Sequence, residues 1–142
     1  MPSTRRRRRQ PESKPEFFID RDLGRYKVPQ AVREMGFVVH PLYEVYPDAE
    51  EGTEDPDWIA DSAARGWIVL CRDKLRHPGE RPAIERHKGR VFRVARRAKN
   101  SDQQIEYIGN NIHRITQRAR RPGPFIYRID RNRIEKIWPK EE

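Results

Sequence analysis

The chain has 142 residues, a formal net charge of +9, and slightly more charged residues (37%) than hydrophobic ones (35%). This length fits one domain with a small core, since domains commonly have about 100–150 residues. No apolar run approaches the roughly 18 residues of a membrane-spanning helix, and no apolar segment follows the N-terminal basic run as in a secretory signal, so we expect a cytoplasmic protein without a membrane span.

The first fifteen residues differ in composition from the rest of the chain. They include the run Arg5–Arg9 and hold six basic residues against one acidic residue, which places +5 of the net charge there and +4 in residues 16–142. With three prolines and no apolar residue beyond Met1, this composition is typical of a disordered segment. We expect a disordered basic tail over 1–15, which contacts RNA, contacts a partner or is simply solvated, and a folded domain over 16–142.

Strand and helix patterns alternate along the predicted domain. Short apolar runs predict strands, and apolar residues at steps of three and four predict helices. In chain order the predicted elements are a strand at 17–19, a helix at 28–35, a strand at 37–39, a helix that begins at Asp55 and ends before Gly66, a strand at 67–71, a short helix at 83–87, a strand at 91–94, a helix at 102–119, and a hairpin with strands at 125–129 and 133–138.

Local signals support these assignments. Asp55-Pro56 is a typical helix start, with Asp as the cap and Pro in the first turn. The longest predicted helix carries Ile105, Ile108 and Ile112 on one side, and Asp130-Arg131-Asn132 forms the turn of the last hairpin. Strands that alternate with helices favour an α/β fold of three layers, α/β/α, in which helices cover both faces of a mostly parallel central sheet and the C-terminal β-hairpin adds antiparallel strands at one edge.

Carboxylates stand at the ends of two predicted strands. Asp20 follows the first strand, with Asp22 beside it, and Asp73 follows the strand at 67–71. Asp55 opens the helix that leads into that strand, so the start of this helix lies at the same edge of the sheet. In open α/β sheets, ligands bind beyond the carboxyl ends of the strands. We therefore expect Asp20, Asp55 and Asp73 to converge there, and Asp57 is close enough in sequence to replace Asp55, as is its neighbour Glu54.

Such a cluster predicts a metal site. Converging carboxylates repel one another, and hard divalent cations with oxygen ligands, Mg²⁺ or Mn²⁺, relieve that repulsion. These ions activate water and stabilise charge on a phosphodiester. Simpler roles remain open, because Asp55 could only cap its helix, and Asp20 and Asp73 could only pair with neighbouring bases. The candidate ligands are Asp20, Asp22, Asp55, Asp57 and Asp73.

Other chemistries find less support in the sequence. The four histidines show no zinc-ligand spacing among themselves or with Cys71. Cys71 ends an apolar run, so we expect it to be buried, which argues against a Cys–His nucleophile. A lone cysteine also favours a reducing compartment. Gly109-Asn110-Asn111 is expected inside a helix, and no Gly-rich phosphate loop is present.

The charges are arranged unevenly along the chain. Residues 72–99 hold eleven Lys or Arg against three acids, whereas residues 48–61 hold seven acids and no base. This arrangement fits a metal pocket flanked by residues that contact phosphates. An ordinary solvated surface is the simpler reading for any single base. The candidate RNA-binding residues are Arg21, Arg25, Arg72, Lys74, Arg76, Arg97 and Arg114.

Four stretches resemble the PIN-like family, which includes the toxins of VapBC-type toxin–antitoxin pairs and their reduced relatives, and the last stretch resembles the C-terminal part of the reduced group. The family pattern is a strand that ends in Asp, an Asp that opens a helix, and a strand that ends in Thr-x-Asp. The matching stretches are Phe17-Phe18-Ile19-Asp20-Arg21-Asp22, Asp55-Pro56-Asp57-Trp58-Ile59, Gly66-Trp67-Ile68-Val69-Leu70-Cys71-Arg72-Asp73-Lys74 and Arg121-Pro122-Gly123-Pro124-Phe125-Ile126-Tyr127.

The resemblance implies a Mg²⁺- or Mn²⁺-dependent endoribonuclease with Asp20, Asp55 and Asp73 as catalytic acids. Such proteins are often toxins that a cognate antitoxin neutralises, and often homodimers. The chain departs from the family pattern at Cys71, which replaces the Thr, and in lacking an evident acid-bearing insert, for which Glu44 is the nearby candidate. Three acids suit one ion better than two. The alternative function is a non-catalytic PIN-like module that binds RNA or protein; a DNA-binding role has only the net charge in its favour.

Overall fold

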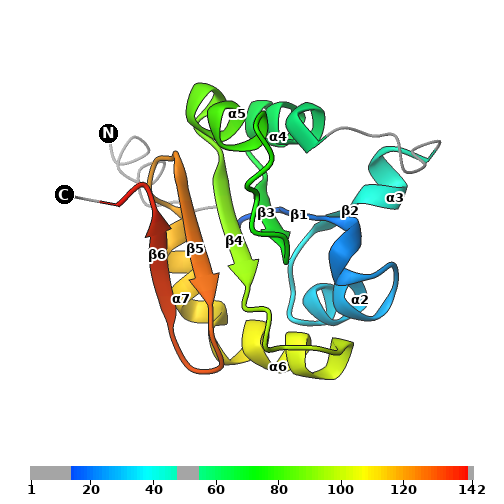
Figure 1. Ribbon diagram of the computed structural model, residues 1–142. Helices are drawn as coiled ribbons and strands as arrows, with labels where there is room; N and C mark the ends of the chain where they lie inside the picture. Colours follow the sequence, from blue (N-terminus) through cyan, green and yellow to red (C-terminus); the bar gives the residue numbers. More distant parts are fainter. Residues whose placement is uncertain (1–13, 48–54, 141–142) are drawn as a thin grey trace, which may run out of the picture.

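A six-stranded sheet forms the middle of the molecule (Figure 1). The computed structural model describes residues 14–47 and 55–140, with Asp55 and Pro56 described only in their backbone. In spatial order the strands run β2-β1-β3-β4-β5-β6. Their bounds are β1 Phe17–Ile19, β2 Val39–Pro41, β3 Ile68–Cys71, β4 Arg90–Val94, β5 Phe125–Ile129 and β6 Ile134–Trp138.

All strand pairs from β2 to β5 are parallel, and β6 alone pairs antiparallel with β5. The register sets Ile19 of β1 beside Leu70 of β3, and Cys71 of β3 beside Arg93 of β4. In the next pair, Arg93 lies beside Arg128 of β5. Because parallel strands share one direction, the residues that follow β1, β3, β4 and β5 meet at one edge of the sheet, the carboxyl edge.

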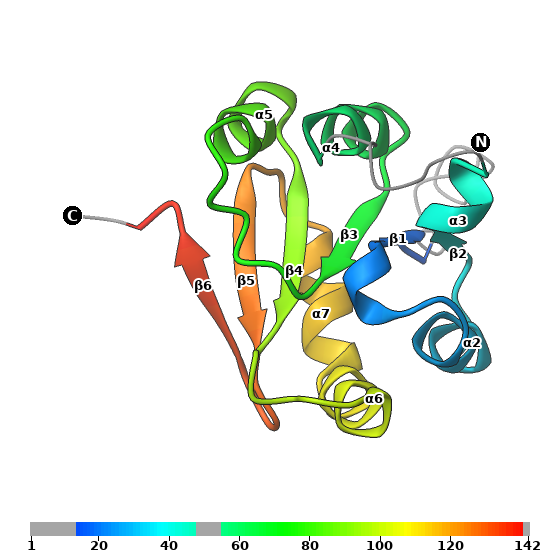
Figure 2. The ribbon, with the colours of Figure 1, turned by 45° about the vertical axis from the view of Figure 1, so that its right-hand side comes forward.

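Helices cover both faces of the sheet, as Figure 2 shows. Helices α2, α6 and α7 pack on one face, and α3, α4 and α5 lie on the other. This is the three-layer α/β/α arrangement with a C-terminal hairpin that the sequence predicts. The helix bounds are η1 Arg21–Leu23 (a short 3-10 helix), α2 Lys27–Glu34, α3 Leu42–Val45, α4 Asp55–Ala64, α5 Glu80–His87, α6 Ser101–Asn110 and α7 Ile112–Ala119.

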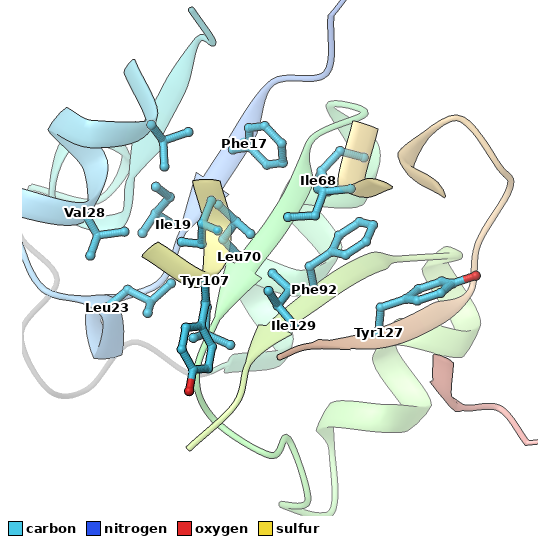
Figure 3. Close-up of a cluster of buried hydrophobic side chains, with 14 of the residues drawn as sticks. Phe17, Ile19, Leu23, Val28, Ile68, Leu70, Phe92, Tyr107, Tyr127 and Ile129 are labelled. Atoms are coloured by element: carbon cyan, nitrogen blue, oxygen red, sulfur yellow. The ribbon is translucent and has the colours of Figure 1, made fainter. Parts of the chain in front are cut away.

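The larger core lies between the sheet and the α2, α6 and α7 layer (Figure 3). Alternate strand residues point into it, because successive side chains of a strand face opposite sides of the sheet. Phe17 and Ile19 of β1 face this core, and Phe18 between them faces the other. On the helix side the buried residues are Val28 and Val32 of α2, Tyr107 and Ile108 of α6, and Ile115 and Ala119 of α7.

The second core lies under α4 and α5. Trp58 and Ile59 of α4 and Ile84 of α5 are buried there against Phe18 of β1, and Trp58 stacks on the Phe18 ring with centroids 5.3 Å apart. Cys71 also belongs to this core and is fully buried, as the sequence predicts. Both faces of the central strands are therefore covered, which explains their continuous apolar runs.

Most predicted elements are confirmed, with shifts at their ends. The second strand is Val39–Pro41 rather than 37–39, because Phe37 packs edge-to-face on Phe17 (5.4 Å) and leaves strand pairing to the next residues. The helix expected at 83–87 begins at Glu80. Pro82 sits in its first turn, where no backbone donor is needed. The short helices η1 and α3 were not predicted.

The prediction of one helix over 102–119 is wrong, because the chain breaks at Asn111 into α6 and α7. Gly109-Asn110-Asn111 therefore ends a helix instead of lying inside one. The fully buried Asn111 amide donates to the Tyr107 carbonyl (2.8 Å) and the Asp130 carbonyl (2.7 Å). An Asn side chain that satisfies backbone carbonyls competes with helical hydrogen bonds, and here it ties the break to the β5–β6 turn.

At the N-terminal boundary, the described chain begins at Lys14, one residue before the predicted end of the tail. The Lys14 ammonium donates to the Gly36 carbonyl (3.5 Å) and lies over the Phe37 ring at 5.4 Å. The run Arg5–Arg9 and Glu54 lie outside the described residues. Among the residues that the structure describes, no helix is both long and apolar enough to cross a membrane.

Candidate active site

Asp20 follows β1 at the carboxyl edge of the sheet. Its backbone is extended, and its nitrogen donates to the Leu70 carbonyl (3.0 Å), so the β1–β3 pairing continues to this residue. The carboxylate accepts a hydrogen bond from the Arg21 nitrogen (2.8 Å) and thereby caps η1. Asp20 is only 5% exposed, which is unusual for a carboxylate and limits its access to bulk water.

Asp22 lies on η1 and reaches across to the end of β3. Both of its carboxylate oxygens lie 3.1 Å from the Arg72 nitrogen, so they accept one shared hydrogen bond. This contact fixes the segment after β1 against the segment after β3. Asp22 therefore contributes negative charge to the edge while part of its hydrogen-bonding capacity is already used.

Asp73 stands two residues after β3, at the start of the loop that leads to α5. Its Oδ1 accepts from the Leu75 nitrogen at 3.2 Å. Leu75 is fully buried and has φ of 57°, a left-handed conformation that side chains rarely adopt. Such a conformation is kept only where the surroundings require it, so this turn holds Asp73 at the edge.

The negative charges of these three aspartates all act on the Cys71 thiol. Burial raises the pKa of the Cys71 thiol well above its ordinary value, and the charges of Asp22, Asp20 and Asp73 raise it further, against the opposing charge of Arg93. The Cys71 thiol points to the Asp73 carbonyl at 3.8 Å. Within the described part of the chain, no three Asp, Glu, His or Cys side chains are grouped closely enough to hold a metal ion.

The acids predicted on α4 are only partly described. Asp55 is the first residue of α4, as expected, but its side chain lies outside the described residues. Asp57 is exposed, and its charge acts on Tyr46, whose hydroxyl donates to Asp61. Glu44, the candidate for the missing family glutamate, is exposed and pairs with Arg33 at 3.0 Å.

Among the predicted RNA-binding residues, Arg72 and Arg114 hold the fold together. The Arg72 guanidinium donates to the carbonyls of Ala98 (3.2 Å) and Arg96 (2.8 Å), which ties the loop after β4 to the loop after β3. Arg114 donates to the Asn110 carbonyl (3.3 Å) at the break between α6 and α7. Both arginines are therefore engaged in contacts within the protein.

The other predicted bases have more freedom. Arg25 is exposed and its guanidinium lies 3.9 Å from the centroid of the Tyr43 ring. Arg21 is half-buried on η1. Exposed bases follow the strands at the carboxyl edge, and they are Lys74 and Arg76 after β3 and Arg97 after β4.

Two charged residues near this edge were missed by the sequence reasoning. Glu80 opens α5, is 1% exposed, and accepts from the His77 nitrogen (2.9 Å). Arg93 of β4 is 7% exposed, and its Nε has no hydrogen-bond partner in the described structure. A signal for Arg93 was present, because it is a charge within the apolar run 91–94. Glu80 carries no such signal.

A basic pocket lies at the β5–β6 turn. Its volume is about 300 Å³, and it opens at the same edge as the aspartates. Asp130 lies within it and pairs with Arg128 at 3.1 Å. The lining residues are Arg97, Arg128, Asp130, Arg131, Asn132 and Arg133.

Comparison with known proteins agrees with this geometry. The sequence model of a family described as "PIN like domain" matches residues 15–96. The chain belongs to the PIN-like family. The matched range runs from before β1 to just past β4 and so includes Asp20, Asp22, Asp55 and Asp73. The family resemblance and the fold class predicted from the sequence are both confirmed.

A PIN-like relative resembles most of the chain. It is "Putative ribonuclease VapC45" from Mycobacterium tuberculosis (strain ATCC 25618 / H37Rv), which is 32% identical over 124 residues, or 85% of this chain and 90% of the relative. The similarity thus extends beyond β4 into the C-terminal part of the PIN-like domain. No solved structure matches the chain significantly.

Proposed function

We propose that this PIN-like protein is a metal-dependent endoribonuclease of the VapC toxin type. The observation that carries the proposal is that Asp20 and Asp73 follow two adjacent parallel strands at the carboxyl edge, and that Asp22 reaches from η1 to the end of β3, so that all three charges act on the Cys71 thiol. Membership of the PIN-like family and similarity to a protein named as a ribonuclease support the same function. The proposed catalytic acids are Asp20, Asp55 and Asp73.

The residue types at this edge fit a hard divalent cation. Three carboxylates act on one buried thiol and raise its pKa, so negative charge accumulates where a cation would be stabilised. Their oxygens are the ligands that Mg²⁺ and Mn²⁺ prefer. We propose Asp20 and Asp73 as ligands from the strand ends, with Asp55 from α4 and Asp57 as its substitute. Asp22, which already accepts from Arg72, contributes mainly charge and position.

The two proposed ligands at the strand ends are held by local structure. Asp20 is fixed by the β1–β3 pairing and by its cap on η1, and Asp73 by its bond to Leu75. When bound, the ion would supply an activated water and neutralise charge on the phosphodiester. The low exposure of Asp20 strengthens its electrostatic effect, because charges interact more strongly away from water. Three acids suit a site for one ion.

The bases around the acids are proposed to contact RNA phosphates. Lys74, Arg76 and Arg97 are exposed beside the strand ends, where no structural contact of their side chains is described. The basic pocket at the β5–β6 turn extends this surface away from Asp20. Phosphate contacts orient a nucleic acid without reading its sequence, so they suit the positioning of a strand across the acids.

The same edge suits a protein inhibitor. An antitoxin that inserts an arginine or lysine among Asp20 and Asp73 would neutralise the charge that the metal otherwise neutralises, and it would displace RNA. The name VapC of the relative makes a toxin–antitoxin pair the natural proposal. A neighbouring gene for a short DNA-binding protein, whose product binds this chain, would support it. A homodimer is also proposed, and light scattering of the purified protein tests it.

The testing experiment is a Mn²⁺ titration that follows both ion binding and cleavage of a mixed RNA pool. Wild type is compared with Asp20→Asn and with Glu85→Gln, a matched control at an exposed site on α5 near the opposite edge. Metal-dependent cleavage by wild type and Glu85→Gln, lost in Asp20→Asn, is the expected result. If well-folded wild type neither binds Mn²⁺ nor cleaves, the protein is a non-catalytic module.

A further inference from the structure

Arg93 is a buried cation whose side chain forms no ion pair and no hydrogen bond with the described residues. Arg93 is 7% exposed and its Nε is buried without a partner. Arginine stays protonated at neutral pH, and an unpaired buried charge is costly. Such a group in a folded protein calls for an explanation.

The neighbours of Arg93 increase this cost. Cys71 lies beside it on β3 and Arg128 beside it on β5. Burial lowers the pKa of the Arg93 guanidinium; the charge of the Cys71 side chain opposes this, and the charges of Arg128, Arg76 and Arg81 lower the pKa further. Asp130 and Glu135 pair with Arg128 instead, at 3.1 and 2.8 Å. Among the residues that the structure describes, no carboxylate therefore forms an ion pair with Arg93.

Arg93 stands in one row with the proposed metal ligands. Phe92 and Val94 face the larger core, so Arg93 faces the α4 and α5 side, as Cys71 does. Asp20 continues the β1–β3 pairing one residue beyond Ile19. It therefore lies beside Cys71 on the β1 side of β3, whereas Arg93 lies beside Cys71 on the β4 side. Adjacent strands lie about 4.8 Å apart, so the backbones of Asp20 and Arg93 are roughly 10 Å apart across β3. The Cys71 thiol responds to the charges of both.

We propose that Arg93 is an anion-binding residue that holds a backbone phosphate of the RNA beside the acid cluster. The proposal rests on the nuclease function proposed above and names a contact that positions its substrate. A guanidinium matches a phosphate geometrically, because it presents parallel N–H donors to two oxygens. A phosphate that arrives with the substrate supplies the ion-pair partner that Arg93 lacks. The nearby exposed base Arg76 supplies a second positive charge for it.

The test measures the binding of a fluorescent single-stranded oligoribonucleotide to the full chain in EDTA, where the proposed metal-dependent cleavage does not occur. Arg93→Met removes the charge and keeps a side chain of similar length. Arg93→Lys keeps the charge but lacks the parallel N–H donors of a guanidinium. The matched control is Arg86→Met, which removes the same charge from an exposed site near the C-terminal end of α5, toward the opposite edge of the sheet. The same proteins are melted with and without inorganic phosphate.

Arg93→Met is expected to weaken RNA binding by about tenfold or more, because a hydrogen bond to a charged group contributes at least about one factor of ten. The slope of log affinity against log salt should fall by roughly 0.7, the value for one phosphate contact to a single strand. Arg93→Lys should be intermediate and Arg86→Met within about twofold of wild type, given the distance of its charge. Phosphate should raise the melting temperature of wild type more than that of Arg93→Met, which keeps the other basic residues of this edge.

The melting temperature without phosphate separates binding from a structural role. Removing an unpaired buried charge should leave Arg93→Met at least as stable as wild type. Unchanged RNA affinity in Arg93→Met overturns the proposal, as does a large loss of stability with an undiminished response to phosphate. If wild type fails to cleave RNA in Mn²⁺ but Arg93 governs phosphate binding, the nuclease proposal fails and the anion site stands. If cleavage depends on Asp20 and RNA binding does not depend on Arg93, the nuclease proposal stands and the anion site fails.

Discussion

Both carboxylate oxygens of Asp22 lie 3.1 Å from the backbone nitrogen of Arg72, a residue fifty positions later in the chain. The contact joins η1 to the end of β3, and each of these segments carries one proposed metal ligand, Asp20 or Asp73. It thus sets the distance between two acids that the sequence places far apart.

Asp22→Ala should destabilise the protein by about 1–2 kcal/mol, because the Arg72 nitrogen loses a charged acceptor. The melting temperature should fall by roughly 3–6 °C for a domain of this size. Asp102→Ala is the control, since Asp102 is exposed and its ion pair with Lys27 at 3.7 Å is weak. Equal melting temperatures for Asp22→Ala and the control would show that the Asp22–Arg72 contact adds little to stability.

Asp20→Asn should separate metal binding from folding. In EDTA it should be as stable as wild type or slightly more stable, since Asn can still accept from Arg21 while one repelling charge is removed. Mn²⁺ at about a hundred times its dissociation constant should stabilise wild type by about 2.7 kcal/mol and leave Asp20→Asn unchanged. Differential scanning fluorimetry measures both effects. An equal Mn²⁺ response in the two proteins would place the ion elsewhere.

The buried Cys71 thiol should make the stability of the folded protein depend on pH in the alkaline range. Burial and the three aspartates raise the pKa of its thiol in the folded protein, whereas the unfolded chain has an ordinary thiol pKa of about 8.5. The stability that this difference provides is fully present below about pH 8.5, and it is lost above that pH, because the unfolded chain then releases a proton that the folded chain keeps.

The free energy of unfolding of wild type should therefore fall by up to about 1.4 kcal/mol per pH unit above pH 8.5, relative to Cys71→Ala, which cannot titrate there. Urea denaturation of both proteins from pH 7 to 10 measures the difference. Parallel curves would mean that the thiol ionises equally in the two states. The thiol should also resist alkylation in the folded protein at neutral pH, because the thiolate is the reactive form.

Asn111→Ala should cost about 2 kcal/mol, because the carbonyls of Tyr107 and Asp130 lose their donor and the fully buried side chain leaves a small cavity. Asn110→Ala is a matched control, since Asn110 is exposed and donates to Arg131 and Asn132 at the surface. Its expected cost is below about 1 kcal/mol. Chemical denaturation compares the two, and a larger loss in Asn110→Ala would contradict this account of the break between α6 and α7.

Removal of residues 1–13 should leave the melting temperature unchanged, because this segment has almost no apolar residue to bury and the cut keeps the Lys14 contacts. Calorimetry of the shortened chain beside the full chain measures this. A fall of several degrees would mean that the segment packs on the domain. RNA affinity of the two proteins then reports whether Arg5–Arg9 contacts the substrate.

The order of strands and helices, and the carboxylates at the ends of β1 and β3, followed from local patterns in the sequence. Strand runs such as Trp67–Cys71 and the helix start at Asp55 depend on residues within a few positions, so the pattern alone was sufficient. The PIN-like family was recognised from these same residues. Whether Asp55, Asp57 and the other acids hold an ion together stays a prediction.

Relationships between distant segments were decided only by the tertiary structure. Asn111 breaks the long predicted helix because the Asp130 carbonyl, nineteen residues away, accepts from its amide. The phosphate contact predicted for Arg72 stays a prediction, but only the tertiary structure shows that its guanidinium also donates to the carbonyls of residues 96 and 98. In the sequence, Arg93 is only a charge within an apolar run, and the tertiary structure sets it between Cys71 and Arg128 on the neighbouring strands. Periodicity reports which side a residue faces, but a partner from elsewhere in the chain determines what that side contains.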